Sequence, residues 1–574
     1  MRVLLRSLLL TWLFVIAVPG FAQHPIPEQW HGELVTPGGK LLLLVSLHRN
    51  AAGIASGDME SISQAPGQKM PLDAITATAA QLSFSIPAIG ARVAAVWNDQ
   101  QDAWVGEFRQ GLTLPLMLKR GAPPAADVIQ GLDGQWRANL RRDGRDLRLV
   151  LHIVTGSTGT RITLDSPDLG AFGLPVEALT RNGDEVSFSV PSAGVAFTGT
   201  LDHVAGSLRG GWSRAGQVAV EVDFRRDTTK TSQRRRSQWP LIAATYRAQE
   251  VAIPNGQARN VVLAGTLTLP PGPGPFPAVI LISGSGAQDR DETMFGHKPF
   301  AVLADYLSRR GIAVLRYDDR GFGASSGDFE QATSADFALD ANAAFAYLRG
   351  RPEIDPRAIG FAGHSEGGMV GPIAAVENPA LAFLIMLAGP GTSTDQLILS
   401  QRRAAGLAQG LSAQAIDRTD PVLRHIMRTV QTARPADNLH ASLRSLLSSE
   451  AMHTLGMAES QRDNLVEHFA SPWMRYFLGY RPEENLRRLR LPILALGGSL
   501  DTQVPTAENL GFIRQALVAN DQATVVELPG LNHMFQHARS GTIGEIADIE
   551  ETFAPHVMSM IAEWIAGRFI PRKG

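Results

Sequence analysis

The chain of 574 residues contains no cysteine. This absence excludes disulfide bonds, thiolate metal ligands, a cysteine nucleophile and a lipid anchor attached through cysteine. The formal net charge is only −2, because 53 lysine and arginine residues nearly balance 55 aspartate and glutamate residues. A chain so close to neutrality lacks the general positive field that attracts nucleic acid or an anionic membrane. The composition is that of an ordinary folded protein, and the length predicts more than one domain.

Long hydrophobic runs are also lacking, apart from a short one at the N-terminus. Arg2 and Arg6 precede the apolar stretch 8–18, and small residues follow it around Ala22. This pattern predicts a secretory signal peptide over residues 1–22, cut before Gln23. The apolar stretch is short for a transmembrane helix, and an uncleaved anchor is the alternative. We therefore expect an exported protein, periplasmic or secreted, with no stable membrane span.

Residues 24–228 carry almost no helical periodicity. Alternating apolar and polar residues are separated by Gly, Pro, Asn and Asp, a pattern typical of antiparallel strands. The region also repeats itself, because residues 70–76 resemble residues 174–180 at a spacing of 104. Trp30 and Trp136 match at a spacing of 106, a slip that small changes in turn length explain. We predict a duplicated all-β region whose matched aromatic residues form the core of each copy.

The predicted segments follow from these boundaries. They are the signal peptide 1–22, β-rich repeat 1 over 24–122, β-rich repeat 2 over 130–228, a linker over 229–239 and a catalytic domain over 240–574. The linker contains Arg234-Arg235-Arg236. A nucleic-acid patch is one reading of these arginines, but a short basic run between two domains favours an exposed linker.

Residues 240–574 alternate between apolar strands and helices. The predicted strands are 261–269, 278–282, 312–316, 358–362, 381–387, 492–498 and 523–528, and the predicted helices include 300–309, 335–348, 368–376 and 546–569. Such alternation indicates an α/β domain with a mostly parallel, doubly wound sheet covered on both faces. A helix-rich stretch at about 394–482, with helices at 397–411 and 439–457, interrupts the alternation. We expect this insertion to form a cap over the carboxyl ends of the strands.

The central motif is Gly363-His364-Ser365-Glu366-Gly367, placed between a predicted strand and a predicted helix. In a nucleophile elbow, a tight strand-to-helix turn of the form G-x-S-x-G lifts a serine hydroxyl above the sheet. The pattern occurs a second time around Ser325. No apolar helix follows that second match, so we interpret it as a glycine-rich loop and select Ser365 as the nucleophile.

A nucleophilic serine needs a base that takes its proton and an acid that orients the base. The order expected for this arrangement of strands is Ser, then Asp or Glu, then His. Asp501 follows the predicted strand 492–498, and His533 follows the strand 523–528. We predict Ser365, Asp501 and His533 as a catalytic triad. We expect no catalytic role for two nearby histidines: the His364 side chain, beside the serine on the turn, should point away from the site, and His537 should lie in the following helix or loop.

An oxyanion hole should use the amide after the nucleophile, that of Glu366, and one from the loop after the first buried strand. For that second donor we predict Ser285, with Gly286 as the next candidate. The charged residues 288–292 of the same loop can be interpreted as a substrate site. We favour the other interpretation, in which they form ion pairs that hold the loop in place.

Residues 240–574 resemble the α/β-hydrolase superfamily. They are most similar to exported bacterial hydrolases related to serine aminopeptidases and to esterases of the prolyl-oligopeptidase type. The resemblance rests on Ser283-Gly284-Ser285-Gly286, on residues 316–323, on residues 363–368 and on the loops of Asp501 and His533. It implies the α/β-hydrolase fold and the Ser-Asp-His triad. Many relatives carry His-Gly where Ser283-Gly284 stands, so the chain departs from the family at the oxyanion loop.

These features predict a serine hydrolase that cleaves carboxylic esters through an acyl-enzyme intermediate, with no metal and no cofactor. The expected substrate is a small-molecule ester or a short peptide, and no nucleic-acid partner is expected. A serine peptidase with the same triad is the alternative, and the acids Glu450, Glu459 and Glu467 are candidates to bind a substrate amino group. A third hypothesis makes the β repeats an envelope-binding module beside a vestigial hydrolase domain. The presence of all three triad residues disfavours it.

Overall fold

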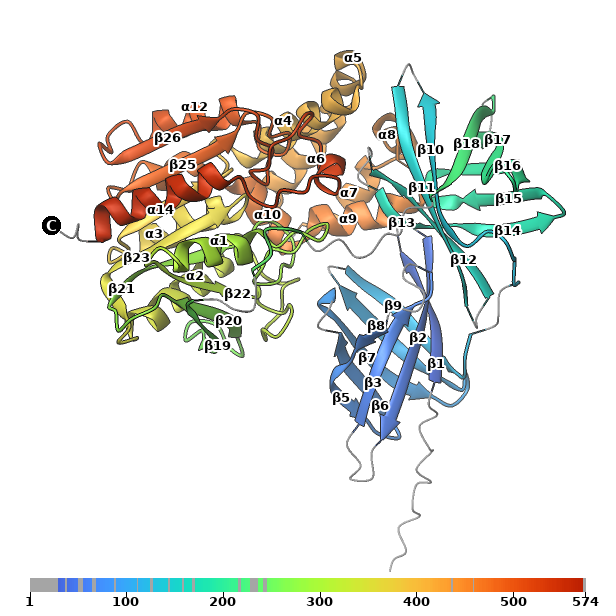
Figure 1. Ribbon diagram of the computed structural model, residues 1–574, viewed down its shortest axis with the longest axis horizontal. Helices are drawn as coiled ribbons and strands as arrows, with labels where there is room; N and C mark the ends of the chain where they lie inside the picture. The colour runs from blue at the N-terminus through green and yellow to red at the C-terminus, as the bar shows by residue number, and fades with distance from the viewer. Residues whose placement is uncertain are drawn as a thin grey trace, which may run out of the picture.

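The computed structural model describes residues 29–570, apart from residues 37–38, 50–54, 64–68, 87–88, 111, 124–126, 143–144, 157–158, 168–170, 215–217, 228–235, 241–244, 435–436 and 458. The predicted signal peptide lies outside the described residues and stays a prediction. The described strands form two sheets of nine strands and one sheet of eight strands. In Figure 1 the two nine-stranded sheets stand beside a larger domain, in which helices flank the third sheet.

The two nine-stranded sheets are entirely antiparallel and share one topology. The first contains β1 (Gln29–Thr36), β2 (Gly39–Arg49), β3 (Ala55–Ser61), β4 (Lys69–Pro71), β5 (Asp73–Ala77), β6 (Gln81–Ile86), β7 (Ala91–Asn98), β8 (Ala103–Gln110) and β9 (Leu112–Arg120). The second contains β10 (Gly134–Arg142), β11 (Arg145–Gly156), β12 (Gly159–Ser166), β13 (Ala171–Pro175), β14 (Glu177–Asn182), β15 (Glu185–Val190), β16 (Val195–Asp202), β17 (Ser207–Arg214) and β18 (Val220–Asp227). The strand orders β4-β3-β2-β1-β9-β8-β7-β6-β5 and β13-β12-β11-β10-β18-β17-β16-β15-β14 correspond strand for strand. The predicted all-β duplication is confirmed.

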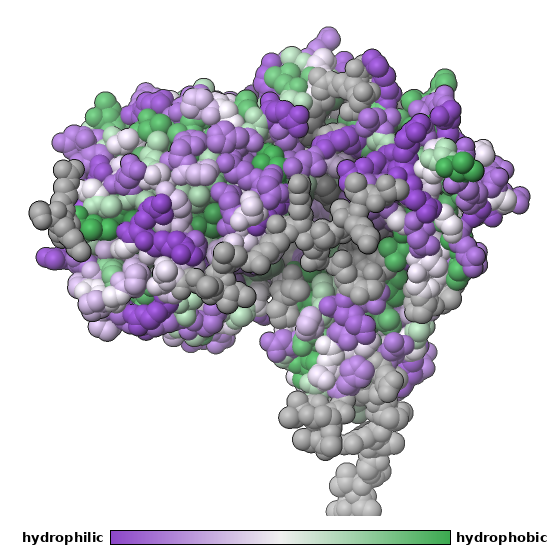
Figure 2. Space-filling view, in the orientation of Figure 1, coloured by the Kyte–Doolittle hydropathy of each residue, from purple (hydrophilic) through white to green (hydrophobic). Residues whose placement is uncertain are grey.

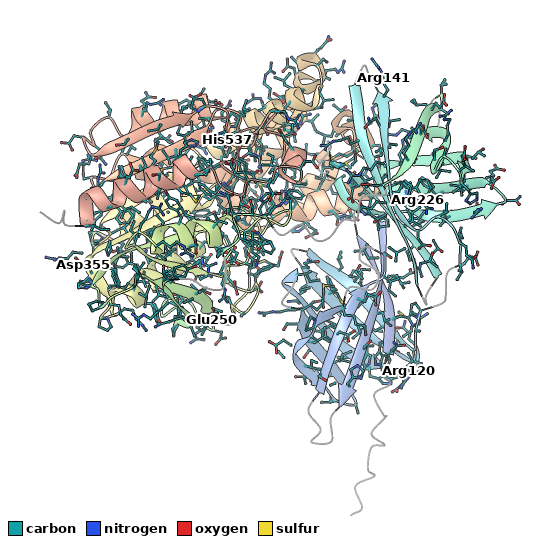
Figure 3. The ribbon with its side chains drawn as sticks, viewed as in Figure 1. Arg120, Arg141, Arg226, Glu250, Asp355 and His537 are labelled. Carbon is teal, nitrogen blue, oxygen red and sulfur yellow. The ribbon has the colours of Figure 1, made fainter. Side chains whose placement is uncertain are left out.

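Matched residues of the two copies also have matched environments. Trp30 pairs with Arg120 across β1 and β9, and Trp136 pairs with Arg226 across β10 and β18. In each copy the arginine guanidinium lies over the indole ring, at 5.1 Å for Trp30 and 4.6 Å for Trp136. Figure 3 labels Arg120 and Arg226 in their respective sheets. Both tryptophans are buried, which confirms that the matched aromatic residues belong to the two cores.

The third sheet holds the predicted parallel strands. Its strands are β19 (Arg247–Pro254), β20 (Val262–Leu269), β21 (Phe276–Ile282), β22 (Ala313–Tyr317), β23 (Ile354–His364), β24 (Phe383–Leu387), β25 (Ile493–Gly498) and β26 (Ala523–Leu528). Their order is β19-β20-β22-β21-β23-β24-β25-β26, and every pair from β22 to β26 is parallel. The strand β19 was not predicted from the sequence, and it joins the edge of the sheet antiparallel to β20.

Both faces of this sheet are buried, which explains why its strands are continuous apolar runs. Along β21, Ile280 and Ile282 pack into one core, whereas Val279 and Leu281 pack into the other. The helices α2 (Ser334–Arg349), α3 (Gly367–Glu377) and α12 (Thr506–Ala516) cover the first face. The helices α1 (Pro299–Ser308) and α14 (Pro555–Phe569) cover the second face. The doubly wound arrangement is confirmed.

The predicted closing helix 546–569 is wrong in its first part. Only a short turn, α13 (Ile543–Ile546), occurs there, and α14 begins at Pro555. Proline is well suited to the first turn of a helix because it has no amide hydrogen to contribute to the helix interior. The residues between the two helices instead bind the segment before the third sheet, because the Gln238 side chain accepts from the Phe553 amide and donates to the Phe553 carbonyl.

The stretch between β24 and β25 is helical, as predicted for the cap. It contains α4 (Thr394–Gln409), α5 (Ala413–Asp417), α6 (Asp420–Thr432), α7 (Leu439–Leu446), α8 (Ser449–Leu455), α9 (Arg462–Ala470), α10 (Pro472–Gly479) and α11 (Pro482–Leu486). The predicted helix 439–457 is two helices, because the Ser448 hydroxyl accepts from the Ala451 amide and caps the start of α8. These helices have a core of their own, which includes Leu443, Val466 and Leu478.

One residue near the end of the predicted linker is buried. Arg236 is buried and donates to the carbonyl oxygens of Ala547 and Ile549 at 2.7 and 2.8 Å. The expectation of an exposed linker is therefore wrong at this residue, and the remaining arginines of the run lie outside the described residues. A guanidinium so enclosed by carbonyl oxygens is not available to nucleic acid.

Large apolar side chains that reach the surface are scattered over different elements. Val204, Val218 and Val518 are among the most exposed. On the face drawn in Figure 2, hydrophilic and apolar residues are interspersed. Isolated apolar residues of this kind are normal on protein surfaces. No helix of the described chain combines the length and the apolar character needed to cross a membrane.

Candidate active site

Ser365 lies on a tight turn flanked by Gly363 and Gly367. It joins the end of β23 to the start of α3 and has a φ of 53°, a left-handed conformation that non-glycine residues rarely adopt. A Cβ atom on Gly363 would overlap the backbone of Gly367, and one on Gly367 would overlap the carbonyl oxygen of Ile282. The two glycines of the motif are therefore required by close backbone approach, and the turn has the geometry of a nucleophile elbow.

The second G-x-S-x-G match has a structural role, as predicted. Ser325 is buried, and its hydroxyl donates to the Asp318 carbonyl at 2.7 Å and accepts from the Ala264 amide at 2.8 Å. Its hydrogen-bonding capacity is thus used within the fold.

Asp501 and His533 form a buried pair at the carboxyl ends of β25 and β26. His533 Nδ1 and Asp501 Oδ2 are 2.7 Å apart. The other carboxylate oxygen of Asp501 accepts from the amides of Gln503 and Val504, each at 2.8 Å. These bonds fix the carboxylate, which in turn orients the imidazole and leaves its Nε2 for a reacting group.

His364, the residue before Ser365, connects the elbow with this pair. The rings of His364 and His533 have centroids 4.7 Å apart, and His364 Nε2 lies 3.0 Å from the His533 carbonyl oxygen. The expectation that His364 points away from the site is wrong. The elbow and the Asp501–His533 pair thus meet at one edge of the sheet.

The amides predicted for the oxyanion hole have no hydrogen-bond acceptor among the described residues, unlike the neighbouring amide of Gly284. The Gly284 amide donates to Glu292 Oε1 at 2.8 Å and is already occupied. Within the part of the chain that the structure describes, the amides of Ser285, Gly286 and Glu366 donate to no other residue. Ser285 and Glu366 line the same cavity as Ser365. Their amides are therefore suited to bind a developing oxyanion.

The Glu366 side chain connects the elbow to the cap. Its Oε1 accepts from Ser334 Oγ at 2.6 Å and from Trp473 Nε1 of α10 at 2.7 Å. Burial raises the pKa of Glu366, and hydrogen bonds from the side chains of Ser334, Trp473 and Ser285 oppose this rise. Only the amide of Glu366 was predicted to belong to the site, because the cap partner of its side chain lies 107 residues away along the chain.

The charged residues in the loop after β21, which carries the predicted oxyanion donors, form a scaffold, and this confirms the favoured interpretation. Arg290 donates from Nε to Asp318 Oδ1 and from Nη2 to Asp318 Oδ2, both at 2.9 Å. Asp319 accepts from the Ser283 hydroxyl at 2.7 Å and from the Gln288 amide at 2.9 Å. These bonds hold the oxyanion loop against the end of β22.

A cavity of about 310 Å³ lies above Ser365, between the sheet and the cap. Its apolar wall comes mainly from cap helices and contains Leu397, Ile398, Phe469, Trp473, Met474 and Phe477. The rings of Trp473 and Phe477 are stacked at 4.8 Å. The size and the largely apolar lining are typical of small-molecule sites. A larger cavity of about 440 Å³ lies between the two nine-stranded sheets, and it contains no residue of the predicted triad.

The other candidate residues lie away from this cavity. Glu450, Glu459 and Glu467 are exposed on the cap and are not among the residues that line the cavity. His537, labelled in Figure 3, pairs with Glu551 at 2.8 Å on the surface, as expected for a histidine without a catalytic role. Within the described residues, no cluster of histidine and acidic side chains is arranged to hold a metal ion.

Comparison with known proteins finds similarity to hydrolases over the C-terminal part of the chain. Residues 297–538 match the family model described as serine aminopeptidase, S33. Esterase EstD of Thermotoga maritima is 26% identical over 307 residues, which cover 53% of this chain and 64% of that protein. The uncharacterized protein Rv2307c of Mycobacterium tuberculosis is 35% identical over 120 residues, which cover 21% of this chain and 38% of its own. The chain spans less than two thirds of the length of these curated relatives.

Two solved structures of esterases align with part of this chain. The Pyrococcus furiosus esterase Pf2001 aligns with 57% of this chain and 94% of its own, at 17% identity and a TM-score of 0.35. The esterase Est1E of Butyrivibrio proteoclasticus, whose structure holds ferulic acid, aligns with 55% of this chain and 96% of its own, at 18% identity and a TM-score of 0.33.

Proposed function

We propose that the α/β-hydrolase domain over residues 240–574, which resembles esterases, hydrolyses carboxylic esters through an acyl-serine intermediate. The observation that carries the proposal is the 2.7 Å contact between His533 Nδ1 and Asp501 Oδ2, beside an elbow that presents Ser365. An oriented imidazole next to a serine is the arrangement that activates a hydroxyl nucleophile.

The reaction proceeds in two steps. In the first, Ser365 Oγ attacks the ester carbonyl while His533 Nε2 takes the hydroxyl proton, and the negative charge forms on the carbonyl oxygen. The amides of Glu366 and Ser285 bind that oxygen, with Gly286 as the further candidate donor. His533 then protonates the leaving alcohol. In the second step water attacks the acyl carbonyl while His533 Nε2 takes its proton. The bond to Ser365 Oγ then breaks, His533 returns the proton to that oxygen, and the acid is released.

The cavity favours an ester with an apolar group next to the scissile bond. A volume of about 310 Å³ holds roughly ten groups of the size of a water molecule, at about 30 Å³ each. Aliphatic and aromatic side chains of α4, α9 and α10 supply much of the wall. We therefore propose a medium-sized acyl group, aliphatic or aromatic, as the bound part of the substrate.

A peptidase with the same triad is the second candidate, and the description of the matching family model favours it. An aminopeptidase needs an acidic or aromatic site for the substrate amino group. Glu366 is the acid on the cavity wall, and its Oε1 already accepts from Ser334 and Trp473. This occupancy argues against an acidic amine site at Glu366. The aromatic wall of Phe469, Trp473 and Phe477, in contrast, suits the aromatic kind of site, so the substrate panel decides between ester and peptide.

A substrate panel separates the two candidates. The wild-type protein should hydrolyse p-nitrophenyl esters of short to medium acyl chains much faster than aminoacyl p-nitroanilides. Ser365→Ala should lose ester turnover by roughly 10⁶-fold, because the nucleophile is removed while the cavity remains. Faster anilide cleavage would favour the peptidase. Equal turnover by the wild type and the variant would overturn the assignment of the site.

A further inference from the structure

A second carboxylate–histidine pair lies behind the first. His364 Nδ1 is 2.8 Å from Glu292 Oε1, and His364 Nε2 is 3.0 Å from the His533 carbonyl oxygen. The side chains of His364 and Glu292 are only 7% and 3% exposed. Such a deeply buried pair is costly to remove from water, so it persists only where its geometry is well satisfied.

The hydrogen bonds of this pair determine its charge. Glu292 Oε1 also accepts from the Gly284 amide at 2.8 Å, so this oxygen acts as an acceptor. The His533 carbonyl is an acceptor as well. Both ring nitrogens of His364 face oxygen atoms. Both can donate at the same time only when the ring is an imidazolium, which a Glu292 carboxylate stabilises.

The pair touches all three parts of the proposed site. Through Gly284 it holds the oxyanion loop, and through the backbone of His364 it is continuous with the nucleophile Ser365. Through the carbonyl of His533 it holds the loop that carries the base. Neither Glu292 nor His364 is among the residues that line the cavity above Ser365. They can therefore affect the reaction only through the groups that they hold.

We propose that Glu292 and His364 are positioning residues, which keep the oxyanion loop and the loop of His533 in register with Ser365. This inference rests on the proposed function of the triad. Small displacements of reacting groups lower rates strongly, because the gain from a bound geometry depends on near-attack distances. Loss of either residue should therefore lower kcat and leave KM nearly unchanged.

The pair also predicts a pH dependence. The charged and titratable groups that face His364 are Glu292, His533 and Asp501. Burial, the largest influence, lowers the pKa of His364, but the Glu292 carboxylate, the His533 carbonyl and Asp501 together raise it above the ordinary value. A raised pKa means that the imidazolium persists to a higher pH than in an ordinary histidine, and the proton is lost as the pH rises through the raised pKa. A neutral ring has one N–H for two acceptors, so kcat should fall on the alkaline side.

The test compares His364→Gln and Glu292→Gln with the wild type and with His537→Gln. His537 is a matched control, because it makes the same 2.8 Å contact with a glutamate outside the site. Titration with a fluorophosphonate would count the active sites in each preparation. Dividing the rate by this count gives a kcat that misfolded protein does not lower. We expect kcat per active site to fall roughly 10- to 100-fold in His364→Gln and Glu292→Gln, with unchanged KM and an unaffected His537→Gln.

The pH profiles complete the test. The alkaline fall of kcat should disappear in His364→Gln and move to lower pH in Glu292→Gln, where the carboxylate that retains the proton is gone. Wild-type rates per active site in both variants, or a wild-type kcat that stays flat up to the pH of unfolding, would overturn the positioning role. Ser365→Ala in the same assay keeps the outcomes distinct. If the wild type has no Ser365-dependent activity, the proposed function fails, and if only the two variants equal the wild type, the positioning role alone fails.

Discussion

Asp501→Asn is expected to lower kcat about 10⁴-fold, the effect typical of a triad aspartate. The asparagine amide can present an N–H to His533 Nδ1, which favours the tautomer whose Nε2 carries the hydrogen. That nitrogen can then no longer take the proton of Ser365. The fold should survive, because the retained Oδ1 still accepts from the amides of Gln503 and Val504.

The measurement is steady-state ester hydrolysis, with circular dichroism to verify folding. Asp355→Asn is the matched control, because the Asp355 carboxylate also accepts from a backbone amide, that of Arg357, at 3.0 Å. Asp355 lies near the start of β23, at the end of the strand far from Ser365. Figure 3 shows its place in the domain. The control should keep wild-type kcat. A folded Asp501→Asn protein within tenfold of wild-type kcat would contradict the role given to Asp501.

Gly363→Ala is expected to prevent normal folding of the catalytic domain. The added methyl group would overlap the carbonyl oxygen and carbon of Gly367, which belong to the backbone and have no free rotation to relieve the contact. Overpacking in a closed site typically costs about 1–3 kcal/mol, and a backbone clash at the elbow should lie at or above the upper end of this range. We expect a large loss of soluble, active enzyme and a lower Tm for the catalytic domain.

Gly511→Ala is the control for which we expect no loss of stability. Gly511 lies in α12, and a Cβ there would meet nothing within 4 Å. Alanine in a helix interior is favoured over glycine by roughly 0.5–1 kcal/mol, so Tm should stay or rise slightly. Normal yield and Tm for Gly363→Ala would show that the elbow is looser than the close approach of Gly363 and Gly367 implies.

The parallel sheet was predictable because each strand carries its own signal. Burial on two faces makes a strand apolar along its whole length, as in β21, β24 and β25. β19 was missed because it is an edge strand with several exposed residues, so its apolar pattern is weak. The start of α14 was placed too early because the apolar pattern continues upstream of Pro555, where the chain makes contacts with Gln238 instead.

Candidate residues of the site were predictable where a local motif or the order of strands marks them. Ser365, Asp501 and His533 each follow a recognisable strand. Glu292 and Trp473 were missed as partners of the site, because they reach it from 72 and 107 residues away along the chain. His364 was misjudged for the same reason: its position beside Ser365 is local, but its side-chain partners come from two distant loops. Only the tertiary structure brings these groups together.

The most direct test of the central claim is the mass of the intact protein after reaction with a fluorophosphonate, which forms a stable adduct with an activated serine. We expect one phosphonyl group per chain, located on Ser365 by peptide mapping, and none in Ser365→Ala. A label on another serine, an equal label in Ser365→Ala, or no label on the wild type would contradict Ser365 as the activated nucleophile.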